Sequence, residues 1–202
     1  MVPNNQPVDS TLSDSESKKK FDVSKQEIND LLEIHMKMDE ADGREPSATG
    51  RRPRQVQVLH RAAIIMITAC WQAYLEDLFR EASNKLLSHE NAYQDILKSY
   101  VDEKLHYFHN PLSDKVNRLF KCLGLENLSH HWTWKAMSHN NAMEKLDKYV
   151  SIRHEIAHGG ESNDSKPDKS VVKDYLNHVE RLVEKTEEAV KNHVEQTNQV
   201  GC

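Results

Sequence analysis

Residues 153–160, Arg-His-Glu-Ile-Ala-His-Gly-Gly, contain two overlapping patterns that predict different chemistries. Arg153 and His158 form an Arg-x4-His pair, which joins a permanent cation to a residue that can act as a general base. His154, Glu155 and His158 also form a His-Glu-x-x-His sequence, which on a helix is the zinc-binding pattern of metallopeptidases. The first pattern predicts a metal-independent ribonuclease and the second a zinc enzyme, so the surrounding sequence has to decide between them.

The zinc hypothesis lacks a third protein ligand in the sequence. His154 and His158 would share one helix face, and Glu155 would activate a metal-bound water. No histidine follows shortly downstream, where Glu161 stands three residues after His158. Glutamates of the last helix could be proposed instead, but such peptidases also bind substrate along a sheet edge, and the sequence predicts no strand. A zinc metallopeptidase therefore remains a second alternative, and we expect neither a metal nor a cofactor.

The Arg-x4-His pair predicts cleavage of RNA by its own 2′-hydroxyl. An imidazole ordinarily titrates near neutrality and can remove the 2′-hydroxyl proton, while a guanidinium stabilises the extra negative charge on phosphorus. Five helical residues do not place Arg153 directly over His158, but both lie at the helix end, where Gly159-Gly160 frees the backbone and the arginine can reach back. We expect His158 to be the general base, Arg153 the phosphate-stabilising cation, and His154 the group that orients the pair or protonates the leaving oxygen.

The apolar positions along the chain follow helical spacing, and no segment alternates as a strand would. Predicted helices begin at Ser24-x-x-Glu27, near Gln55, at Asn91-x-x-Gln94, at Asn110-Pro111, at Asn141-x-x-Glu144 and at Ser170. The helix over 55–87 is apolar around most of its circumference and is expected to be central. Gly124 and Gly159-Gly160 are expected to end two of the helices, and the last is expected to continue to about Val194. This pattern predicts an all-α bundle of about five to six helices.

Length and composition favour one compact domain. The chain has 202 residues, of which 37% are apolar, and its three cysteines do not suggest a disulfide scaffold. Residues 1–20 are polar, with no apolar core of a signal peptide, and the run Ala62–Trp71 is interrupted by Thr68 and too short to cross a bilayer. We therefore expect a soluble cytoplasmic protein without a membrane partner, divided into a disordered tail (1–20), a helical domain (21–197) and a C-terminal tail (198–202).

Two helical segments carry a family resemblance. Residues 61–75, RAAIIMITACWQAYL, and residues 150–159, VSIRHEIAHG, are similar to the central helix and the catalytic helix of the RiboL-PSP-type branch of the HEPN superfamily (higher eukaryote and prokaryote nucleotide-binding domains). The similarity extends over about 23–197. Two positions differ from the usual family pattern: His154 replaces the common Asn or Asp after the arginine, and Gln72 replaces the common Glu after the aromatic residue.

The resemblance implies a HEPN-like homodimer in which two motifs face each other across a cleft and cleave RNA without a metal. It also implies a toxin or antiphage defence effector held in check by an antitoxin or another regulatory protein. Because the net charge is −5, any RNA-binding surface must be a local one. Candidate RNA contacts outside the motif are Gln72 and the basic cluster Arg51, Arg52 and Arg54. The main alternative is a non-catalytic HEPN module that binds RNA or a partner, although the retained Arg153 and His158 argue against it.

Overall fold

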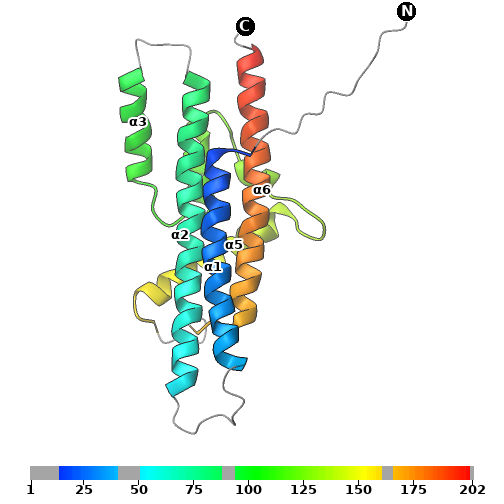
Figure 1. The fold of residues 1–202 in the computed structure, drawn as a ribbon. Helices are drawn as coiled ribbons and strands as arrows, with labels where there is room; N and C mark the ends of the chain where they lie inside the picture. Colours follow the sequence, from blue (N-terminus) through cyan, green and yellow to red (C-terminus); the bar gives the residue numbers. More distant parts are fainter. Residues whose placement is uncertain (1–13, 41–50, 88–93, 161–165, 201–202) are drawn as a thin grey trace, which may run out of the picture.

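The computed structural model describes residues 14–40, 51–87, 94–160 and 166–200, and these form an all-α bundle (Figure 1). The helices are α1 (Glu16–Glu40), α2 (Arg51–Leu87), α3 (Gln94–His106), α4 (Ser113–Lys121), α5 (His139–Ala157) and α6 (Lys169–Val200), and a 3₁₀ turn, η2 (Leu128–His131), lies between α4 and α5. Within the described residues no strand forms, apart from a single bridge between Trp134 and Met137. The predicted all-α class is confirmed.

Helix α2 lies at the centre of the bundle. It packs against α1, α3, α4, α5 and α6, and Figure 1 shows the long helices α1, α2 and α6 side by side, with α3 beside the C-terminal part of α2. The ring of Trp71 stacks on Tyr74 at a centroid distance of 5.8 Å and meets Trp132 edge-on at 6.1 Å. These aromatic contacts join α2 to the segment between η2 and α5, and they place all three rings in the core.

Helix α1 begins at Glu16, earlier than the predicted start at Ser24. Residues 16–20, the end of the predicted disordered tail over 1–20, are therefore helical. Ser15 caps the helix, because its hydroxyl accepts a hydrogen bond from the backbone N–H three residues further on. The Ser15 N–H and hydroxyl also donate to the carboxylate of Glu187 in α6, at 2.9 and 2.7 Å. These contacts join residues 172 positions apart, so local composition could not show them. The rest of the predicted tail, residues 1–13, lies outside the described residues.

The buried carboxylate of Glu187 anchors this end of α1. Glu187 is 5% exposed, and its carboxylate accepts a hydrogen bond from the Tyr74 hydroxyl at 3.2 Å and pairs with the Lys191 ammonium at 3.0 Å. Burial alone would raise the pKa of Glu187, but the hydrogen bonds from Ser15 and Lys191 outweigh it and hold the pKa below its ordinary value. The carboxylate is therefore ionised and satisfied, and it ties three helices together.

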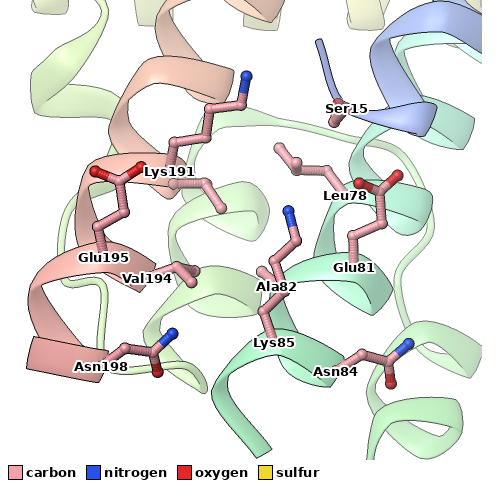
Figure 2. A pocket seen from close by; sticks show the side chains of 11 residues that line it. Ser15, Leu78, Glu81, Ala82, Asn84, Lys85, Lys191, Val194, Glu195 and Asn198 are labelled. Atoms are coloured by element: carbon pink, nitrogen blue, oxygen red, sulfur yellow. The ribbon is translucent and has the colours of Figure 1, made fainter. Parts of the chain in front are cut away.

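A cavity of about 600 Å³ lies beside this anchor, between the C-terminal parts of α2 and α6 (Figure 2). Lys85 and Glu81 of α2 line it opposite Glu195 of α6. The predicted catalytic motif contacts α2 near Arg61, about twenty residues earlier in the same helix. At 1.5 Å per residue, the cavity and the motif are separated by roughly 30 Å along α2. The cavity is therefore separate from the candidate active site.

The starts of α2 and α5 also differ from the prediction. Helix α2 begins at Arg51 instead of near Gln55, so the basic cluster lies in its first turns and not in a loop. Pro53 is compatible with this position, because N–H groups in the first turn have no intrahelical partner. Helix α5 begins at His139, because the Ser138 hydroxyl accepts a hydrogen bond from the N–H three residues on and caps the helix earlier than predicted.

Helix α6 runs to Val200, beyond the predicted end near Val194 and into the predicted tail over 198–202. The residues after Val194 are polar, but none is Pro or Gly until Gly201. Each added residue gains a backbone hydrogen bond once the helix exists, so polar side chains alone do not stop it.

Among the described residues, one helix is long and apolar enough to cross a membrane by length and composition, over Gln55–Leu86 of α2. The expectation rested on the short run Ala62–Trp71 alone, whereas the helix continues beyond it at both ends. The most apolar window of this helix is 44% buried inside the protein, and the core helix of a soluble protein has the same composition. Length and composition therefore do not assign α2 to a membrane.

Candidate active site

The Arg-x4-His motif lies at the C-terminal end of α5, as predicted. The helix ends at Ala157, His158 is the C-cap residue, and Gly159 has a φ of +74°, which glycine adopts without strain. The Gly160 N–H donates to the carbonyl of Glu155 at 2.8 Å, and a Cβ at Gly160 would lie only 3.0 Å from that oxygen. The two glycines thus end the helix directly after the histidine and leave its side chain at the surface.

His154 and His158 face each other on the exposed surface of this helix end. Their ring centroids are 4.3 Å apart, with an interplanar angle of 54°. Both residues are exposed, and the i, i+4 spacing accounts for their contact. The structure therefore brings two imidazoles, each able to accept or donate a proton, to one accessible place.

Arg153 is partly buried and directed at the linker between α3 and α4. Its Nη1 donates to the side-chain oxygen of Asn110 at 3.3 Å. Asn110 was predicted to cap α4, but it has a φ of +55°, and the N-cap of α4 is Leu112. Asparagine tolerates this left-handed conformation better than most residues. Because Asn110 does not cap α4, its amide oxygen is available to Arg153. Arg153 is thus held by the linker, and its predicted reach back to His158 stays a prediction.

Tyr149, four residues before Arg153 in α5, packs on the buried Tyr175 of α6. Tyr175 of α6 is fully buried, shares a hydrogen bond of 2.9 Å with the Thr68 hydroxyl and stacks on Tyr149 at 4.2 Å. Burial raises the pKa of Tyr175 far above its ordinary value, although the Thr68 hydrogen bond and the charge of Arg153 act in the opposite direction. Among the described residues Arg153 forms no ion pair with a carboxylate. Its positive charge is therefore not neutralised there.

Helix α2 fixes the end of α5 from the side. The Arg61 Nη2 donates to the carbonyl of Ile156 at 3.3 Å. This carbonyl also accepts from the Gly159 N–H at 3.3 Å, and it belongs to the last turn, where a cation is favourable. Nearby, Gln57 Nε2 and His60 Nδ1 both bond the carbonyl of Pro167, at 3.1 and 3.2 Å. The helix end and the residues before α6 are thus held against α2 by side chains that sequence reasoning did not assign.

Gln72, which was predicted to contact RNA, is hydrogen-bonded within the protein. Its Nε2 donates to the carboxylate of Glu76 at 2.8 Å and to the carbonyl of Phe108 at 3.2 Å. Phe108 precedes Asn110 by two residues, so Gln72 positions the linker that reaches Arg153. The predicted basic cluster consists of Arg51, Arg52 and Arg54. Their side chains are not among those that the structure describes, so their contact with RNA stays a prediction.

The metal-ligand set of the zinc hypothesis is incomplete in the described part of the chain. His154 and His158 could supply two nitrogen ligands, but a catalytic zinc ordinarily has three protein ligands. No group of three or more His, Cys, Asp or Glu side chains among the described residues is arranged to hold a metal ion. The donor set therefore fits a proton-transfer pair better than a catalytic zinc.

The all-α bundle with an Arg-x4-His helix end is that of a HEPN-type domain. The model of the RiboL-PSP-HEPN family matches residues 22–192, and the chain belongs to this family. The comparisons with curated proteins and with solved structures give no match. HEPN domains are often ribonucleases, so the family indicates an RNA-related function.

Proposed function

We propose that this protein is a metal-independent endoribonuclease. The observation that carries the proposal is the state of Arg153: its guanidinium is bonded to the neutral amide of Asn110 and is not paired with a carboxylate among the described residues. The same helix end holds His154 and His158 in contact at its surface. A cation that retains its charge next to an exposed imidazole pair suits a substrate that is a phosphodiester.

In the proposed reaction, His158 removes the proton of the 2′-hydroxyl and the 2′-oxygen attacks phosphorus. The bond between phosphorus and the 5′-oxygen breaks, and the 5′-oxygen takes a proton from a second imidazole, for which His154 is the candidate. Arg153 stabilises the additional negative charge on the phosphoryl oxygens. The products are a 2′,3′-cyclic phosphate and a 5′-hydroxyl, and the step consumes no water.

The proposal includes a homodimer with composite sites. Five residues of an ideal helix turn through about 140° beyond one full turn, so Arg153 and His158 of one subunit face different directions. The hydrogen bond from Arg153 to Asn110 agrees with this divergence. A two-fold axis beside the end of α5 lets the arginine of one subunit and the histidine of the other reach one phosphate.

An exposed apolar stripe on α2 supports the position of this interface. Val58 is 57% exposed and Ile65 is 37% exposed, and both are large apolar side chains on the surface of a core helix. At helical spacing they share one face with three alanines that are exposed or partly exposed: Ala62, Ala69 and Ala73. Arg61, within the stripe region, bonds the end of α5, so the stripe lies next to the motif.

Ala69→Glu is expected to convert the dimer into a monomer and to lower RNA cleavage at least ~10-fold, because a buried unpaired charge in an interface costs several kcal/mol. Ala69 is exposed, so the fold itself should keep its melting temperature. Sedimentation velocity and a cleavage assay measure the two effects. Val23→Glu, at a 64% exposed position of α1, is the matched control. A monomeric Ala69→Glu protein with full activity would contradict the composite site.

A chelator assay separates this function from its alternatives. Purified protein is incubated with labelled single-stranded RNA in excess chelator, and its zinc content is measured in parallel. We expect cleavage without metal. Cleavage that stops in chelator and returns with zinc would favour a metalloenzyme, whereas RNA binding without cleavage would favour the non-catalytic HEPN module.

We also propose that the enzyme acts in the cytoplasm as a toxin or antiphage effector, restrained by an antitoxin or another regulatory protein. Membership of the RiboL-PSP-HEPN family supports this proposal. Within the described residues no other part of the chain covers either histidine, so the helix end is accessible to such a regulatory protein.

A further inference from the structure

A positively charged patch with an exposed aromatic ring lies where α3, its linker and α4 meet. We call it the α3–α4 patch and define it by Lys104, Tyr107, Lys115 and Arg118. These side chains line a surface cavity of about 220 Å³, together with Phe108, Leu119 and Cys122. None of them belongs to the Arg-x4-His motif.

The lining of this cavity carries three cations, Lys104, Lys115 and Arg118, and no carboxylate, whereas the chain as a whole carries −5. Outside the lining, the carboxylate of Glu103 lies 3.7 Å from the Lys104 ammonium. Arg118 contacts Asp114 at 2.8 Å, but its side chain remains 79% exposed, and such surface pairs are weak. The Lys115 ammonium donates to the backbone carbonyl of His109 at 2.8 Å, which leaves its charge unneutralised. The patch therefore attracts an anionic partner.

Tyr107 gives the patch a ring that can stack on a base. It is 72% exposed, more than any other large apolar side chain reported for the described residues, and it stands edge-to-face with His106 at 5.1 Å. The neighbouring Tyr100 differs, because the Lys104 ammonium lies over its ring at 4.7 Å. Basic grooves with exposed aromatic rings are the usual means of binding single-stranded nucleic acid, because every base has a face that stacks.

The linker joins the α3–α4 patch directly to the candidate active site. Tyr107 and Phe108 line the cavity, the carbonyl of His109 accepts from Lys115, and the amide of Asn110 accepts from Arg153. Four residues span at most about 14 Å. A strand with one phosphate near Arg153 therefore reaches the patch within a few nucleotides.

We propose that the α3–α4 patch binds single-stranded RNA that flanks the cleaved phosphate, with a base stacked on Tyr107 and phosphates held by Lys115 and Arg118. The choice of RNA as the ligand rests on the proposed function. An acidic protein segment would match the charges but would not require the exposed ring, so the two partners can be distinguished by experiment.

The test measures binding separately from cleavage. Fluorescence anisotropy with a labelled single-stranded RNA is recorded for the His158→Ala protein, which holds the RNA uncut, with and without patch substitutions. Adding Lys115→Glu and Arg118→Glu should weaken binding at least ~10-fold and reduce the slope of log affinity against log salt by about 0.7 for each lost phosphate contact. Adding Tyr107→Ala should weaken binding about 10-fold and leave the salt slope unchanged. The matched control adds Lys19→Glu and Lys20→Glu on α1, where both side chains are exposed.

Patch variants that keep the affinity and the salt slope of the His158→Ala reference overturn the proposal, even if the wild-type enzyme cleaves RNA. Weakening by the charge reversals but not by Tyr107→Ala also overturns it, because the patch would then contact RNA phosphates without the stacked base that the proposal requires. If the wild-type protein binds RNA through the patch without cutting it, the patch proposal stands and the ribonuclease proposal fails.

Discussion

Replacing His158 with alanine is expected to lower the rate of RNA cleavage at least ~100-fold, the usual scale for a lost general base. The imidazole is exposed at the end of α5, and its backbone N–H, which bonds the carbonyl of His154 at 3.1 Å, is kept by alanine. The melting temperature and the helical circular dichroism signal should therefore match those of the wild type. The rate is measured with a labelled single-stranded RNA under single-turnover conditions.

His131→Ala is the matched control, because His131 is also exposed but lies in η2, outside the motif. It should cleave at the wild-type rate. His154→Ala should have a smaller effect than His158→Ala if His154 only orients its neighbour, and a comparable effect if it protonates the leaving oxygen. Near-wild-type cleavage by His158→Ala would place the chemistry on other residues.

Mixed dimers are expected to regain activity that both parent variants lack. Arg153→Ala and His158→Ala homodimers should each be nearly inactive. In the heterodimer, one site combines the intact Arg153 of one subunit with the intact His158 of the other, so about half of the wild-type activity should return. Two different affinity tags allow the heterodimer to be purified before the cleavage assay.

The outcome depends on where the two side chains meet. If Arg153 and His158 act within one subunit, the heterodimer contains no intact pair and stays as inactive as its parents. Arg153→Lys provides an additional comparison, because a lysine keeps the charge but lacks the planar fork that binds two phosphate oxygens. A restored heterodimer with an impaired Arg153→Lys enzyme would support both the composite site and the role of the guanidinium.

The fold was predictable because periodic apolar positions report on burial directly. Long segments with helical spacing, such as 55–87, became helices, and the central helix was recognised by its wide apolar circumference. The helix starts were less predictable, because a start depends on which cap is satisfied. Ser15 and Ser24 are both serines in polar surroundings, and the distant carboxylates of Glu187 and Glu81, which accept hydrogen bonds from Ser15 and Ser17, favour the earlier start.

The motif itself was predictable, since Arg153 and His158 are close in sequence and their chemistry is specific. Their supports were not, because Asn110 and Arg61 reach the motif from 43 and 95 residues away. Asn110 in particular resembled a helix cap, and Pro111 after it strengthened that interpretation. The left-handed conformation of Asn110 was likewise not signalled by the local sequence.

The central claim, attack by the RNA's own 2′-hydroxyl, is tested most directly by a substrate that lacks this group at one position. Wild-type protein in excess chelator is given an RNA with a mapped cleavage site and a matched RNA with a single 2′-deoxynucleotide on the 5′ side of that bond. We predict a 2′,3′-cyclic phosphate end from the first RNA and no cleavage at that bond in the second. Cleavage of the 2′-deoxy substrate, or a product with a 5′-phosphate, would show that water is the nucleophile and would contradict the proposed mechanism.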